Sequence, residues 1–149
     1  MLRKAAIGDI PQMQELINAF ARADLMLPRS RNELYENLRD FWVFEDGRRV
    51  VGCAALHICW DDLVEVKAVA VAKKYQGKGI GRKLVEACIG EAREMGARRV
   101  FVLTYKPEYF KQFGFRKTTH SSLPHKIWAE CINCPKFPNC EETALIRKV

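Results

Sequence analysis

A glycine-rich loop between Val69 and Ala87 carries the residue types that a phosphate site needs. The stretch reads VAVAKKYQGKGIGRKLVEA, and glycine recurs in it at positions 77, 79 and 81. Glycine removes side chains where a backbone must turn tightly or meet a ligand closely. Lysines and arginines surround the turn, and the predicted helix that follows directs free N–H groups and its positive dipole end at the loop. The pattern therefore predicts binding of a phosphorylated ligand; a loop that only turns a corner is the alternative.

The elements around this loop predict one α/β domain. Asp9 is a candidate N-cap for a first helix with Met13, Leu16, Ile17 and Phe20 on its buried face. Ser30 and Glu33 have capping-box spacing before a second helix. A third helix follows the glycine loop, and a short one lies in PEYFKQFGF. Apolar runs predict strands over residues 2–7, 41–45, 50–60, 63–72 and 98–105, with a final sheet element after Phe115.

Composition limits the classes of partner. The chain has 149 residues, 48% of them hydrophobic, and a net charge of +7. It contains no apolar run of membrane-spanning length and no signal-peptide pattern, so we expect a cytoplasmic protein that does not bind membranes. The positive charge favours anionic partners. The chain has no long basic run, and its aromatic residues do not alternate with basic ones, so the sequence argues against a nucleic acid as partner. A phosphorylated cofactor or an acidic metabolite is the expected anionic partner.

The glycine loop resembles the acetyl-CoA-binding motif of the GNAT family of N-acetyltransferases. That motif has Gln or Arg, two residues, Gly, one residue, then Gly or Ala, which here are Gln76, Gly79 and Gly81. The preceding strand ends in AVAV, and YFKQFGF follows downstream, as in the family. The resemblance implies a mixed central β-sheet with splayed parallel strands flanked by helices, and acetyl-CoA as co-substrate.

The same resemblance assigns cofactor contacts to this strand, loop and helix. Successive N–H groups of the loop would bind the pyrophosphate, and the strand would offer backbone groups to the pantetheine arm and the thioester carbonyl. The residues implied are Val69, Val71, Gln76, Gly77, Lys78, Gly79, Ile80, Gly81 and Arg82.

A second resemblance covers nearly the whole chain. LMLPRS before a helix, CAAL in the hairpin, LVEVKAVAV and VFVLTY are similar to segments of N-acetylglutamate synthases. LPHKIWAECINCPKFPNC resembles the short, single-domain forms of these enzymes, which lack an amino-acid-kinase domain. The resemblance implies acetyl transfer to the α-amine of L-glutamate, a step of arginine biosynthesis.

Catalytic roles follow from that resemblance with one departure. Glu65 matches a glutamate of the synthases and could accept the amine's proton, through a water, although it could also be a solvent-facing strand residue. Many family members place a tyrosine acid where this chain has Phe110, which has no proton to donate. Thr104 and Tyr105, at the end of the neighbouring strand, are the available hydroxyls, and the resemblance favours Thr104 as proton donor, with an ordinary strand threonine as the alternative.

Recognition of glutamate requires cations. Arginine binds a carboxylate through two charge-assisted hydrogen bonds, and Arg29 matches the synthase arginine before the second helix. A second cation is expected from the C-terminal segment, at Lys126 or Lys136, with His125 and Trp128 nearby in sequence. We expect one domain over residues 1–149, whose segment 120–149 covers the acceptor site; a homodimer is left open.

The cysteines fall into two groups. Cys53, Cys59 and Cys88 occupy apolar positions and are expected to be buried. The remaining three, Cys131, Cys134 and Cys140, form a cluster that could bind zinc together with His125. Because this spacing is not that of a standard zinc finger, we expect no metal site, and a cytosolic chain disfavours disulfides.

Two other functions fit these motifs. An acetyltransferase acting on another amine, in a protein or a small metabolite, would keep the cofactor loop and have no need of Arg29. A non-catalytic acyl-CoA-binding module would explain the phenylalanine at position 110.

Overall fold

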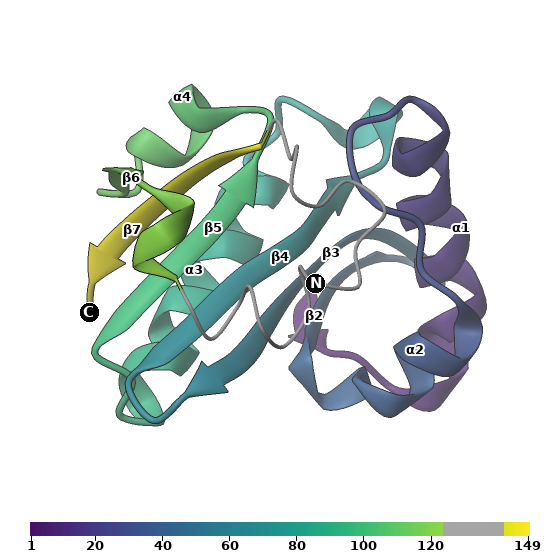
Figure 1. The fold of residues 1–149 in the computed structure, drawn as a ribbon. Coiled ribbons are helices and arrows are strands. Elements are labelled where there is room, and N and C mark those ends of the chain that lie inside the picture. Colours follow the sequence, from purple (N-terminus) through teal and green to yellow (C-terminus); the bar gives the residue numbers. More distant parts are fainter. Residues whose placement is uncertain (124–141) are drawn as a thin grey trace. The chain divides into compact units, whose positions relative to one another are not determined.

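The computed structural model describes residues 1–123 and 142–149. Its strands form one mixed sheet in the order β1-β2-β3-β4-β5-β7-β6 (Figure 1). The strands are β1 (Leu2–Lys4), β2 (Phe41–Asp46), β3 (Arg49–Trp60), β4 (Leu63–Val71), β5 (Arg99–Thr104), β6 (Arg116–Thr118) and β7 (Thr143–Lys148). The helices are α1 (Ile10–Arg22), α2 (Arg31–Glu36), α3 (Ile80–Glu94) and α4 (Pro107–Lys111), with 3-10 turns η1 (Ile7–Asp9), η2 (Leu38–Asp40), η3 (Lys73–Tyr75) and η4 (His120–Ser122). Among the described residues, no helix has the length and apolar character needed to cross a membrane.

The chain divides into two compact units. The first unit comprises Met1–Leu56 and Val66–Glu91, and the second comprises His57–Glu65 and Ala92–Val149. In the first unit β1 pairs with β2 and β2 with β3, both antiparallel. The core includes Met13 and Ile17 of α1, which are fully buried as their helical spacing predicts. Ser30 caps α2 as predicted, because its Oγ accepts the Glu33 N–H at 3.1 Å.

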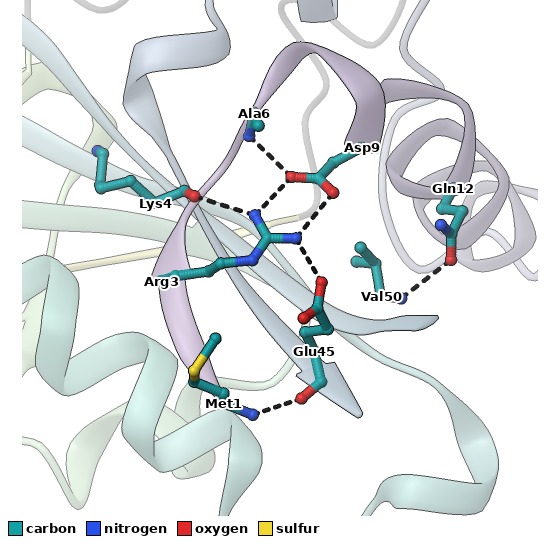
Figure 2. Close-up of polar contacts among 8 residues, drawn as sticks. All are labelled: Met1, Arg3, Lys4, Ala6, Asp9, Gln12, Glu45 and Val50. Carbon is teal, nitrogen blue, oxygen red and sulfur yellow. Dashed lines mark hydrogen bonds and ion pairs between the residues drawn. The ribbon is translucent and has the colours of Figure 1, made fainter. Parts of the chain in front are cut away.

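Asp9 corrects one local prediction. It does occupy the N-cap position of α1, but its carboxylate makes no hydrogen bond to the helix N-terminus. Instead it accepts two hydrogen bonds from the Arg3 guanidinium, at 2.8 and 2.9 Å, and one from the Ala6 N–H at 2.7 Å (Figure 2). Arg3 also binds Glu45 of β2, so this network joins β1, η1 and β2. The Asp9 carboxylate binds the Arg3 guanidinium rather than the helix N-terminus because both Arg3 and Asp9 carry a full charge and form two hydrogen bonds.

The second unit contains a strand that the sequence pattern does not predict. The start of β4 pairs with β5 in parallel, from Leu63–Glu65 to Arg99–Phe101. β7 runs antiparallel to both β5 and β6 and lies between them (Figure 1). β7, the last strand of the chain, thus lies next to β5, whereas β6, which precedes β7 in the sequence, forms the edge of the sheet. Leu145 of β7 is fully buried.

Candidate active site

The glycine loop of the first unit has the backbone that a phosphate site requires. Gly77 and Gly79 have φ of +78° and +82°, in the left-handed region that favours glycine. A Cβ built at either position meets no protein atom within 4 Å. α3 begins directly after the loop, and the N–H groups of its first turn have no acceptor within the helix. The loop and Arg82, on the exposed first turn, fit a phosphorylated group in charge and in space.

Side chains fix the shape of this loop. The Tyr75 hydroxyl donates to Asp46 Oδ2 at 2.7 Å, which attaches η3 to the end of β2. The Gln76 amide donates to the Val71 carbonyl at 3.0 Å, so this motif residue contacts the protein's own backbone. The Lys78 ammonium lies 5.4 Å from the centre of the Tyr75 ring. Asp46 was absent from the predicted site, since nothing in its local sequence marks it.

β4 has an irregularity immediately before Val69 and Val71. Ala68 has φ of +54°, which is strained for a residue with a Cβ. The Cys53 thiol, wholly buried on β3, lies 3.4 Å from the Ala68 carbonyl and accepts a hydrogen bond from the Ala70 backbone. Burial raises the pKa of this thiol to about 12, so it stays protonated and can donate. Strand irregularities of this kind redirect backbone groups and are frequent beside active sites.

Arg29 lies in the first unit, on the loop before α2. Its guanidinium Nη1 is 3.1 Å from Glu33 Oε2, and 22% of its side chain is exposed. Ser30 Oγ accepts the Glu33 N–H and so fixes the Glu33 backbone. The guanidinium is thus oriented by Glu33, and the Arg29 side chain is still partly accessible, which is the arrangement that a carboxylate-binding arginine needs.

Glu65 and Thr104 lie in the second unit. Glu65 is only 3% exposed and is opposite Phe101 in the parallel β4–β5 pair, so it is no solvent-facing strand residue. Thr104 ends β5, where its Oγ1 accepts the Lys106 N–H at 2.9 Å and keeps its own proton to donate. Phe110 is buried, with its ring centre 5.2 Å from that of Tyr109 and 5.9 Å from that of Phe115.

Other predicted residues fall into two classes. The C-terminal candidates Lys126, Lys136, His125, Trp128, Cys131, Cys134 and Cys140 lie outside the described residues. Of the cysteines on regular elements, Cys53 and Cys88 are buried as predicted, whereas Cys59 is half-buried. It lies near the end of β3, where exposed and half-buried residues alternate. Within residues 1–123 and 142–149, no three histidine, cysteine or acidic side chains gather as a metal site would require.

One cavity of about 230 Å³ lies in the second unit. Its lining comes from β5, β6, β7 and η4, and includes Arg99, Arg116 and Lys148. Ser122 and Lys148 of this lining fall within segment 120–149, and none of the individually named candidate residues lines the cavity.

Comparison with known proteins places these features in context. The Acetyltransferase (GNAT) family profile matches residues 10–115. An uncharacterized N-acetyltransferase of Chlorobaculum tepidum is 35% identical over 98% of this chain and 94% of its own length. An amino-acid acetyltransferase of Mycobacterium tuberculosis is 35% identical over 87% of this chain and 76% of its own. The crystal structure of N-acetylglutamate synthase from Neisseria gonorrhoeae, complexed with coenzyme A and N-acetyl-glutamate, has a TM-score of 0.87 at 27% identity; the match covers 99% of this chain and 34% of that one.

Proposed function

The chain belongs to the GNAT family of acetyltransferases, and on that premise we propose that it acetylates the α-amine of L-glutamate. It is an acyltransferase with acetyl-CoA as co-substrate. The choice of glutamate rests chiefly on one observation: Arg29 is oriented by Glu33 and still partly exposed in the segment that resembles the synthases. The product, N-acetylglutamate, would enter arginine biosynthesis.

The first unit supplies residues for both substrates. The N–H groups from Gly77 to Arg82 would receive the pyrophosphate of acetyl-CoA, supported by the left-handed glycines and the open space above them. Val69 and Val71, which follow the irregularity at Ala68, would offer backbone groups to the thioester carbonyl and the pantetheine arm.

Arg29 would bind one carboxylate of glutamate. Its planar fork has donors beyond the nitrogen that faces Glu33, so a substrate carboxylate could bind without breaking that ion pair. Lys126 or Lys136 would supply the second cation; both lie outside the described residues.

Glu65 and Thr104 would move the protons of the reaction. The amine must lose a proton before it attacks the thioester carbon, and the buried Glu65 carboxylate would accept it through a water. When the C–N bond has formed and the C–S bond breaks, the leaving sulfur needs a proton. The Thr104 hydroxyl would supply it, because its oxygen accepts from Lys106 while its hydrogen stays available.

Arg29→Ala tests the choice of acceptor. Loss of a charge-assisted carboxylate contact should lower kcat/KM for glutamate by about 30- to 1,000-fold, mainly through KM, and leave the KM for acetyl-CoA unchanged. Arg29→Lys should recover only part, since an ammonium keeps the charge without the fork. Arg22→Ala is a matched control, because it removes an exposed arginine from the end of α1 in the same unit. An unchanged KM for glutamate in Arg29→Ala would show that Arg29 is not its carboxylate ligand and would remove the main support for glutamate as acceptor.

A further inference from the structure

We propose that Gln14 and Asn18 of α1 are positioning residues that set acceptor selectivity by holding the backbone of Arg29 in place. This inference rests on the proposed function and names two residues that support the proposed glutamate ligand Arg29. Neither residue stands out in the sequence, because both occupy polar positions on an amphipathic helix.

Both backbone polar groups of Arg29 bind side chains of one helix. The Arg29 N–H donates to Asn18 Oδ1 at 3.1 Å. The Gln14 amide nitrogen donates to the Arg29 carbonyl oxygen at 3.2 Å. Residues 14 and 18 are four apart on α1 and therefore share a helix face. A loop residue whose two peptide groups are both bound to a rigid element has little freedom left in its backbone.

Gln14 is held at both ends of its amide group. Its Oε1 accepts a hydrogen bond from Arg31 Nε at 2.9 Å, while its Nε2 donates to the Arg29 carbonyl oxygen. On the other side of Arg29, the Ser30 cap fixes the Glu33 backbone, and the Glu33 carboxylate faces the Arg29 guanidinium. The backbone and the guanidinium of Arg29 are thus oriented by separate contacts.

These contacts are separate from those that fold α1. Met13 and Ile17 are fully buried and pack the helix into the core of the first unit. Gln14 and Asn18 are half-buried beside that stripe, and the hydrogen bonds of Asn18 and Gln14 described above go to the segment Arg29–Arg31. Their removal should therefore loosen the loop more than the core. A contact misplaced by about 1 Å can cost on the order of 10²-fold in rate.

The test compares Asn18→Ala and Gln14→Ala with a variant of the same helix. Each should raise the KM for glutamate by about 5- to 50-fold and lower the selectivity for glutamate over glutamine, with little change in the KM for acetyl-CoA. Gln12→Ala is the matched control, because Gln12 Oε1 accepts the Val50 N–H at 2.9 Å (Figure 2). Like the two test variants, Gln12→Ala removes a side-chain hydrogen bond to a backbone group, so this control should lower thermal stability without changing either KM selectively.

A double-mutant cycle shows whether these residues act through Arg29. In an Arg29→Ala background, Asn18→Ala should add little to the KM for glutamate, because the arginine it positions is gone. If Arg29→Ala raises this KM while Asn18→Ala and Gln14→Ala do not, the inference is wrong and the proposed function stands. Equal increases in the KM of both substrates, as from general loosening, would also overturn it. If Arg29→Ala itself has no effect on this KM, Arg29 is not a glutamate ligand and the inference falls with that assignment, whereas turnover of glutamate by the wild-type protein tests the proposed function separately.

Discussion

Replacement of Gly79 with valine should abolish acetyl-CoA binding while the protein remains folded. The backbone there has φ of +82°, and a side chain in that region costs about 1–2 kcal/mol, more when it is β-branched. By itself this cost reduces the population of the correct loop by about 5- to 30-fold. A Cβ at Gly79 meets no protein atom within 4 Å, so the fold has room for a side chain. The further loss must come from the ligand, whose pyrophosphate would occupy the same space.

Two companion variants separate strain from steric exclusion. Asparagine tolerates left-handed backbone far better than valine, so Gly79→Asn keeps a side chain in the phosphate space while relieving most of the strain. Gly96 is the control: it follows the end of α3 with φ of +86°, and a Cβ there would meet no atom within 4 Å beyond its chain neighbours. Gly96→Val therefore has a similar backbone cost outside the predicted phosphate site.

Calorimetric titration with CoA, together with thermal unfolding, distinguishes these cases. We expect Gly79→Val and Gly79→Asn to lose binding alike, by about 100-fold or more, and Gly96→Val to bind as the wild type does. Recovery of affinity in Gly79→Asn would assign the effect to backbone strain. A folded Gly79→Val protein with unchanged CoA affinity would refute the reasoning that this loop receives the pyrophosphate.

The remaining predictions concern two buried carboxylates. Glu65→Gln keeps the shape of the side chain but accepts no proton, so single-turnover rates should fall by a factor on the order of 10²–10⁴ while the KM for acetyl-CoA changes little; a near-normal rate at neutral pH would assign the base elsewhere. The Arg3 guanidinium holds the pKa of Asp9 below its ordinary value, so this group stabilises the fold above the unfolded-state pKa and loses that effect as pH falls through the folded-state pKa. Denaturant titrations should therefore show an acid-dependent loss of unfolding free energy, below about pH 4, that Asp9→Asn lacks; parallel pH profiles for the two proteins would contradict this.

Apolar periodicity predicted most of the fold because most elements bury one face. Met13 and Ile17 are fully buried as expected, whereas Leu16 and Phe20 of the same predicted helix face are half-buried. β7 was missed because its place depends on long-range pairing with β5 and β6, which no local pattern encodes. The left-handed conformation of Ala68 was missed for a related reason: alanine has no intrinsic preference for it, and the surrounding strands impose it.

The candidate site likewise contains residues that the sequence predicts and residues that it does not. The glycine loop could be predicted from residue type and spacing, since missing side chains are visible in a sequence, and Arg29 was predicted from the resemblance to N-acetylglutamate synthases. The residues that hold them could not be predicted: Asn18 of α1 binds the backbone of Arg29 on a loop, and Asp46 at the end of β2 binds Tyr75. Their side chains are polar, so by sequence alone they read as solvated surface.

The acceptor preference of the wild-type protein tests the central claim most directly. Initial rates of acetyl transfer from acetyl-CoA should be measured with glutamate, glutamine and a neutral amine under identical conditions. Glutamine keeps the α-amine and the α-carboxylate but lacks the side-chain charge. If the site binds both carboxylates, kcat/KM for glutamate should exceed that for glutamine by at least about tenfold, and the neutral amine should be poorer still. Equal turnover of all three would contradict the assignment of glutamate and leave an acetyltransferase of broad acceptor range.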